Sequence, residues 1–173
     1  MNAFPRALAA LTLFAAAAAC GGGSGGEAAA NEPSSQPAAT AEAAAPTVKA
    51  NGTLVTVYKS PTCGCCQKWV EHMQQAGYQV EVHDMENVQP VKDQHGVTSN
   101  LASCHTALVD GYVVEGHVPA EVIQRMLREK PAIAGLAAPG MPRGSPGMEG
   151  PVKDRYDIVA FTKDGKTSVY ETR

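Results

Sequence analysis

The chain has 173 residues, five of them cysteine, and a formal net charge of −3 at pH 7. This slightly acidic sequence contains no stripe of lysine and arginine, so it gives no support for nucleic-acid binding. Its length suits one folded domain of ordinary size once the N-terminal segment is set aside.

The first residues are typical of an export signal. Arg6 precedes an apolar run over residues 7–19 that is too short to span a bilayer. The run ends in Ala18-Ala19-Cys20, followed by glycines, which resembles the cleavage box of a bacterial lipoprotein, although Ala17 replaces the usual leucine. We predict a signal peptide over residues 1–19 with Cys20 lipid-modified; plain secretory cleavage is the alternative. Either outcome places the domain on the periplasmic side of the envelope, with membrane contact only through the lipid.

A flexible tether is predicted over residues 20–52. Residues 21–50 include no aromatic, Leu or Ile residue and are rich in Gly, Ala, Pro, Ser and Glu. Such a segment cannot bury enough apolar surface to offset its ordering entropy. As a flexible coil it would reach on the order of 30 Å. The folded domain is therefore expected over residues 53–173.

The first half of this domain alternates between strand and helix patterns. Residues 54–58 form a run of β-branched and aromatic side chains typical of a buried strand. Apolar residues at spacings of three and four then predict a helix, which Gly77 ends. The expected elements are a strand at 54–58, a helix at about 64–75, a strand at 78–83 and a short helix at 88–95.

The second half begins with the strongest hairpin signal of the chain, the two-residue turn Asp110-Gly111. The expected elements are strands at 106–109 and 112–115, a helix at 120–129 with Pro119 at its first position, a Gly/Pro-rich loop at 131–151, and a final hairpin of strands at 156–161 and 167–170. The order β-α-β-α-β-β-α with an extra C-terminal β-hairpin predicts an α/β domain of the thioredoxin-like class.

Three thiols lie within four residues where the first strand leads into the first helix. Cys63 and Cys66 form a C-x-x-C pair, and residues three apart share one helix face, so these two sulfurs should converge. The helix N-terminus favours a thiolate there. Cys65 points roughly 100° away from Cys66. It is therefore expected to bridge metals or to bind a second one.

The hairpin register predicts a second pair of ligands. Counting outward from the turn places Cys104 opposite His117, and directly opposed side chains lie roughly 5 Å apart at their Cβ atoms. His105 should point to the other face of the sheet. Glu115 should share a face with His117, where it would either orient the imidazole or be exposed.

A thiolate-rich set with imidazole suits Cu(I) and Zn(II). Adjacent thiolates that can bridge favour a multinuclear Cu(I) cluster over a single tetrahedral zinc. Met141 and Met148, in the Gly/Pro-rich loop, either cover such a site as soft ligands or anchor the loop on the core. Trp69 is expected in the core, and His72, His83 and His95 are expected at the surface.

Two other functions are compatible with the cysteines. A thioredoxin-like dithiol–disulfide oxidoreductase would use Cys63 as nucleophile and Cys66 as resolving thiol, although Cys65 would compete for the mixed disulfide. A structural zinc site or two disulfides could instead stabilise a small exported domain. Whether the protein is an enzyme stays open.

Several motifs resemble the periplasmic copper-resistance family CopG, which is also described as a domain of unknown function. They are residues 58–66 with Trp69, His72 and Met73, then residues 103–107, 109–119 and 135–149. Together they cover essentially all of residues 54–170. One departure is Gly96-Val97-Thr98, where the family resemblance predicts Gly-Val-Pro. Thioredoxin-like redox proteins use a proline at this position, so its absence weakens the oxidoreductase hypothesis.

The resemblance implies a thioredoxin-like fold and a copper site built on the C-x-C-C motif. It also implies a role among envelope copper-handling proteins, with Cu(I)/Cu(II) interconversion as one function. Carried over by position, the implied ligands are Cys63, Cys65, Cys66, Cys104 and His117. His105, Met141 and Met148 are further candidates that the resemblance does not settle.

Overall fold

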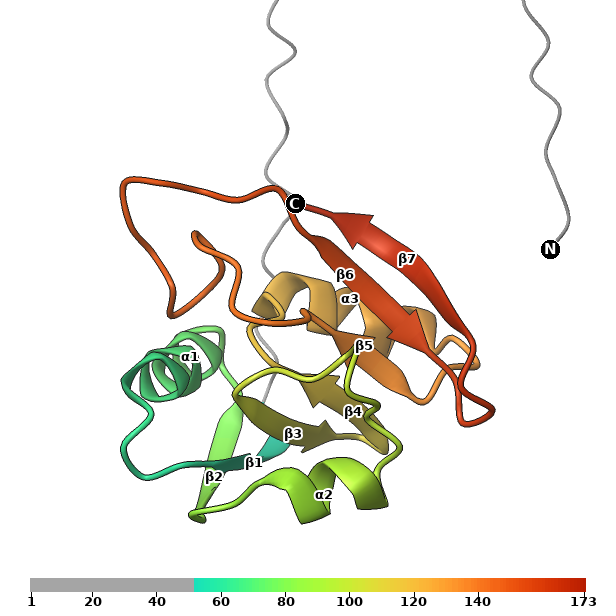
Figure 1. The fold of residues 1–173 in the computed structure, drawn as a ribbon, viewed down its shortest axis with the longest axis horizontal. Coiled ribbons are helices and arrows are strands. Elements are labelled where there is room, and N and C mark those ends of the chain that lie inside the picture. Colours follow the sequence, from blue (N-terminus) through green and yellow to red (C-terminus); the bar gives the residue numbers. More distant parts are fainter. Residues whose placement is uncertain (1–51) are drawn as a thin grey trace, which may run out of the picture. The chain divides into compact units, whose positions relative to one another are not determined.

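The computed structural model describes residues 52–173, which are coloured in Figure 1. The predicted signal peptide, Cys20 and almost all of the predicted tether lie outside the described residues. The helices are α1 (Gly64–Gln75), α2 (Gln89–Gln94) and α3 (Ala120–Glu129). The strands are β1 (Leu54–Lys59), β2 (Gln79–Asp84), β3 (His105–Val109), β4 (Tyr112–Glu115), β5 (Gly135–Ala137), β6 (Asp157–Phe161) and β7 (Thr167–Thr172). None of these helices has the length and apolar character needed to cross a membrane.

Within the described residues the strands form one seven-stranded sheet in the order β2-β1-β3-β4-β5-β6-β7. The pairs β1–β2 and β4–β5 are parallel, and the pairs β1–β3 and β3–β4 are antiparallel. The first seven elements follow the predicted order β-α-β-α-β-β-α. The mixed α/β class is therefore confirmed.

Strand β5 corrects the prediction of a continuous loop over residues 131–151. It pairs with β4 on one side and with β6 on the other, so the C-terminal hairpin extends the sheet beyond β4 (Figure 1). Three residues are too few to show a strand period. Gly135 also lies so close to β4 that a Cβ there would overlap the Val113 carbonyl. The strand exists because its neighbours supply hydrogen-bond partners, which sequence pattern does not record.

Helices α1 and α3 cover the face of the sheet that carries the larger core. The buried stripes of the two helices pack with the inward side chains of the strands in one cluster, among them Trp69, Met73, Ile123, Val57 and Leu136. Trp69 is fully buried, as predicted, and its indole N–H donates to the Val118 carbonyl at 2.9 Å. A smaller cluster that includes Val97, Leu101 and Phe161 covers the opposite face, beside α2.

The N-terminus of α3 corrects two expectations. Pro119 precedes the helix as its N-cap residue and is not its first helical residue. His72 of α1 is half-buried, whereas it was expected to be exposed, and its Nε2 accepts the Ala120 N–H at 3.0 Å. The imidazole thus satisfies one of the amides that a helix start leaves unpaired. Only the packing of α1 beside α3 makes this contact possible. His83 is exposed, as predicted.

Candidate metal centre

The N-terminus of α1 gathers the sulfurs of the C-x-C-C motif. A turn closed by Cys63 N–H donating to Ser60 O at 3.1 Å leads from β1 into the helix, and Cys63 is the N-cap residue. Cys63 and Cys66 form a disulfide, so their predicted convergence is confirmed. Cys65 is a free, half-buried thiol whose Sγ lies 3.5 Å from that of Cys63.

A fourth sulfur reaches this group from the start of β3. The Sγ atoms of Cys63, Cys65, Cys66 and Cys104 all lie within 4.8 Å of one another. Cys104 is also a free thiol. The described residues therefore hold four sulfurs in a volume small enough for one metal centre, once the disulfide is reduced.

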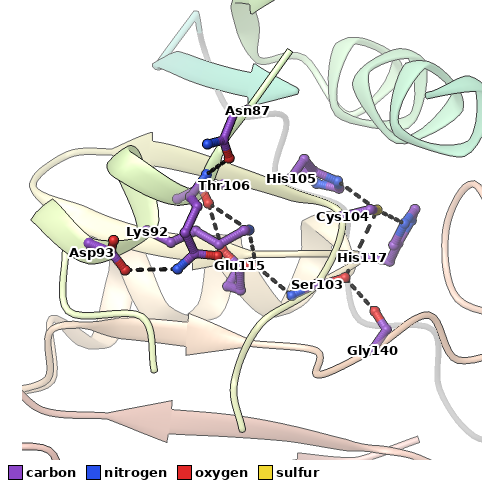
Figure 2. Close-up of polar contacts among 11 residues, drawn as sticks. Asn87, Lys92, Asp93, Ser103, Cys104, His105, Thr106, Glu115, His117 and Gly140 are labelled. Carbon is purple, nitrogen blue, oxygen red and sulfur yellow. Dashed lines mark hydrogen bonds and ion pairs between the residues drawn. The ribbon is translucent and has the colours of Figure 1, made fainter. Parts of the chain in front are cut away.

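Cys104 also belongs to a second group, which is formed with two imidazoles (Figure 2). Its Sγ lies 2.9 Å from His117 Nε2 and 3.5 Å from His105 Nδ1. The ligand atoms of Cys104, His105 and His117 likewise fall within 4.8 Å of one another. Cys104 is thus common to both groups, which is the position required of a bridging thiolate.

The hydrogen bond on the far side of the His117 ring fixes its tautomer. Nδ1–H donates to the Pro146 carbonyl at 2.7 Å, so Nε2 carries the lone pair that faces Cys104. A backbone carbonyl in this role is a common way of orienting a histidine ligand. The Gly/Pro-rich loop therefore contributes to the centre through its main chain.

The meeting of Cys104 with His117 was predicted, but the predicted geometry was wrong. The β3–β4 ladder ends at Thr106 and Glu115, so neither ligand is a regular cross-strand neighbour. Gly116 has φ +71°, and Val118 N–H donates to Gly116 O at 2.9 Å, which makes a tight turn centred on His117. A Cβ on Gly116 would overlap the Ser103 side chain and the Ala138 carbonyl, so only glycine fits there.

His105 is the ligand candidate that this turn changes most. It was expected on the face away from Cys104 and His117, yet its ring lies 4.5 Å from that of Trp69 and 5.0 Å from that of His117, centroid to centroid. The turn at Gly116 moves His117 onto the face that His105 occupies. His105 is fully buried, and its Nε2 has no hydrogen-bond partner among the described residues.

Glu115 corrects both expectations for its side chain. It is fully buried, and its carboxylate pairs with Lys92 of α2 instead of with an imidazole. It also accepts the Thr106 hydroxyl at 2.7 Å and the Ser103 N–H at 2.6 Å (Figure 2). Lys92 was not predicted as a site residue from the sequence. A lone lysine in a short polar helix carries no local signal of burial.

Burial favours the neutral forms of Cys104, His105 and His117. It raises the pKa of Cys104 to about 12, and the neighbouring Cys65 adds to this effect. Burial also lowers the pKa of His117, against the opposing hydrogen bond to Pro146, and it lowers the pKa of His105 well below the usual range. The imidazole lone pairs are therefore available to a metal, whereas the Cys104 thiol must lose a proton to bind one.

The two methionines of the loop occupy different environments. Met148 is half-buried and lines a cavity of about 610 Å³ together with Cys65 and Gly147. Met141 is 54% exposed. A Cβ on Gly147 would lie 2.5 Å from the Cys65 carbonyl oxygen, so the loop rests directly on the start of α1. Cys65 and Met148 therefore line the same open cavity at the start of α1.

Comparison with known proteins bears on this arrangement. A family model described as "Protein of unknown function, DUF411" matches residues 101–148, a segment that contains Cys104, His105 and His117. No curated protein matches the chain. Two solved structures, named "Copper resistance protein copG", Form 2 and Form 1, are each 41% identical to it with a TM-score of 0.67. Each match covers 70% of this chain and 98% of the other.

The chain belongs to the CopG copper-resistance family. The resemblance carried by the sequence motifs is therefore confirmed. In this CopG-family chain, the cysteine and histidine groups at the start of α1 and β3 indicate a metal-binding role related to copper.

Proposed function

We propose that this protein binds Cu(I) on the periplasmic side of the bacterial envelope and sequesters, relays or redox-cycles it in copper resistance. The observation that carries the proposal is the position of Cys104 in both ligand groups. One group supplies sulfur alone, and the other supplies sulfur with two neutral imidazoles. The five proposed ligands are Cys63, Cys65, Cys66, Cys104 and His117, with His105 as a sixth candidate.

The donor set favours copper over zinc. Thiolate and imidazole suit both metals, but structural zinc takes four ligands in one closed tetrahedron. Here the described residues offer four sulfurs and two imidazoles in two overlapping groups, more donors than one tetrahedron holds, and a thiolate can bridge two Cu(I) ions. We therefore propose a multinuclear Cu(I) centre with Cys104 as the bridge. Met148, which lines the same cavity as Cys65, is proposed to contact copper as it arrives or leaves.

The Cys63–Cys66 disulfide makes this binding conditional on redox state. Reduction of the disulfide by a dithiol donor transfers two electrons and two protons and yields two thiols, while the donor is oxidised to a disulfide. Only the reduced pair can supply two thiolates. The oxidised protein keeps Cys65, Cys104 and the histidines, so it is proposed to bind Cu(I) more weakly.

The same disulfide favours a second candidate function, a dithiol–disulfide oxidoreductase. Its support is a C-x-x-C disulfide at a helix N-terminus, next to a strand arrangement that we interpret as thioredoxin-like because β1–β2 is parallel and β1, β3 and β4 are antiparallel. Trapping of a mixed disulfide by Cys66→Ser, or reduction of insulin disulfides, would favour it. The free Cys65 beside Cys63 argues against it, since it competes for the mixed disulfide.

Anaerobic Cu(I) titration of the reduced mature chain against a chelator of known affinity tests the copper proposal. We expect more than one Cu(I) per chain, sulfur-dominated X-ray absorption and a short copper–copper distance. Cys104→Ser should reduce the stoichiometry, whereas the exposed His83→Ala should not. A reduced protein that retains no Cu(I), or that retains zinc in preference to it, would contradict the proposal.

The proposed location rests on the N-terminal residues. Cys20→Ser should release the protein from the membrane fraction into the soluble periplasmic fraction. Unchanged fractionation of this variant would exclude Cys20 as the anchor.

A further inference from the structure

A buried ion pair lies on the face of the sheet opposite the histidines. Lys92 of α2 and Glu115 of β4 are 5% and 0% exposed. Their pairing is completed by Thr106, whose hydroxyl lies 3.1 Å from Lys92 Nζ and 2.7 Å from Glu115 Oε2. None of the three residues belongs to the proposed ligand set, so the proposed copper chemistry does not account for them.

A buried ion pair is weak evidence for a stabilising role. Two charges lose their hydration on burial, and apolar residues of similar volume often serve stability equally well. Removing one partner alone is costly, because the other charge is then left unpaired. The position of this pair therefore calls for a reason other than the free energy of unfolding.

The reason lies in the third contact of the Glu115 carboxylate, after those with Lys92 and Thr106. Glu115 Oε1 accepts the backbone N–H of Ser103 at 2.6 Å, and Ser103 immediately precedes Cys104 (Figure 2). Glu115 itself lies two residues before His117, on the strand that leads into the His117 turn. One side chain thus ties the segment that carries the shared sulfur to the strand that carries the imidazole.

Ser103 is also held from its other side. Its hydroxyl donates to the Gly140 carbonyl, and Gly140 N–H donates to Ala102 O at 3.0 Å. The Cys104 segment lies outside the β3–β4 ladder, so ladder hydrogen bonds do not fix it. The contacts to Glu115 and Gly140 take their place.

We propose that Glu115, held in place by Lys92, is a positioning residue that fixes Cys104 against His117 through the Ser103 amide. The expected effect on Cu(I) affinity rests on the proposed copper-binding function, whereas the positioning of Cys104 does not. Lys92 supplies the charge that lets a carboxylate remain buried at this point. The carboxylate in turn supplies the acceptor that no neighbouring backbone group offers to Ser103.

Two double variants isolate the acceptor from the charge. Lys92→Met with Glu115→Gln removes both charges but keeps an oxygen for Ser103, whereas Lys92→Met with Glu115→Leu removes both charges and the oxygen. Thr106→Val is the matched control, because it touches the ion pair but not Ser103. Circular dichroism and thermal unfolding establish that each variant is folded.

The first readout needs no copper. In the oxidised metal-free protein, alkylation of Cys104 is followed by peptide mass spectrometry at fixed pH. We expect the Leu double variant to react about tenfold faster, because Cys104 loses its protected position, and the Gln double variant and Thr106→Val to stay within about twofold of the wild type. The second readout is Cu(I) affinity of the reduced protein, which we expect to fall about 10- to 100-fold in the Leu double variant alone.

Equal behaviour of the two double variants in both readouts would overturn the proposal. If the Leu double variant does not fold, Glu115→Asp alone replaces it. This variant keeps the charge beside Lys92 but withdraws the oxygen by one methylene, and we expect the same two effects with smaller size. A wild type that fails to bind Cu(I) would refute the copper function, while the alkylation readout would still decide the positioning role.

Discussion

Gly147 offers a direct test of how the Gly/Pro-rich loop supports the centre. It has φ +84°, and a Cβ there would lie 2.5 Å from the Cys65 carbonyl oxygen, 3.0 Å from Trp69 N and 3.3 Å from His117 Nδ1. The preceding residue, Pro146, accepts the His117 hydrogen bond. Gly147→Ala must therefore either compress the start of α1 or lift the loop away from it.

The size of the effect follows from three contributions. An L residue in the left-handed region costs about 1–2 kcal/mol. Overpacking against rigid backbone adds about 1–3 kcal/mol if the loop stays in place. If the loop lifts instead, that strain is relieved, but the His117 hydrogen bond is lost at about 0.5–1.5 kcal/mol. We expect Gly147→Ala to lower the free energy of unfolding by about 1.5–5 kcal/mol across these two cases.

The matched control is Gly165→Ala in the turn between β6 and β7. Gly165 has φ +81°, but a Cβ there meets nothing within 4 Å, so this variant should lose only the conformational contribution of about 1–2 kcal/mol. Urea unfolding of the oxidised metal-free proteins gives the stability of both variants. Chelator competition gives their Cu(I) affinity, which should fall about 10- to 100-fold in Gly147→Ala alone. Equal stability losses together with equal Cu(I) affinity in the two variants would refute the reasoning.

Three further predictions follow from individual side chains. The pKa of His72 is lowered, chiefly by burial, against the attraction of Glu121 and Glu149. Because the folded pKa lies below the unfolded value, stability from this group is present above about pH 6.5 and is lost as the pH falls through the folded pKa. Urea midpoints between pH 8 and pH 5 should therefore fall less steeply in His72→Gln, and an identical slope would contradict this. Met148→Leu should slow Cu(I) uptake measured by stopped flow, whereas Met141→Leu should not, because only Met148 lines the cavity beside Cys65. Since burial raises the pKa of Cys104 to about 12, Cu(I) binding at pH 7 should release a proton that an indicator dye detects and that is missing in Cys104→Ser.

Much of the fold could be predicted because its elements carry strong local patterns. The apolar stripe of α1, together with Gly77 after it, predicted the bounds of the helix. The Asp110-Gly111 turn predicted the β3–β4 register as far as Thr106 and Glu115. Strand β5 could not be predicted in this way. It is short, it begins with a glycine, and it is defined by the strands on either side of it.

The candidate site likewise contains features that local sequence patterns predict and features that they do not. Convergence of Cys63 with Cys66 follows from helix periodicity, so it is available from spacing alone. Spacing alone does not predict that His105 and His117 lie on the same face of the sheet. The left-handed Gly116 ends the strand alternation of side chains on which the prediction depended. A single residue of positive φ was enough to move an imidazole to the other side of the sheet.

By itself, the amino-acid sequence determined the order of the first seven elements, the thiol pair at a helix start and the family to which the chain belongs. Tertiary structure alone decided that Lys92 is buried against Glu115 and that the Ser103 N–H donates to the same carboxylate. It also decided that the Pro146 carbonyl sets the His117 tautomer. The physical reason is the distance along the chain over which each interaction acts. Periodicity and turn chemistry act between near neighbours in the chain, whereas a buried charge or an orphan backbone group is satisfied by whichever residue the packing brings to it.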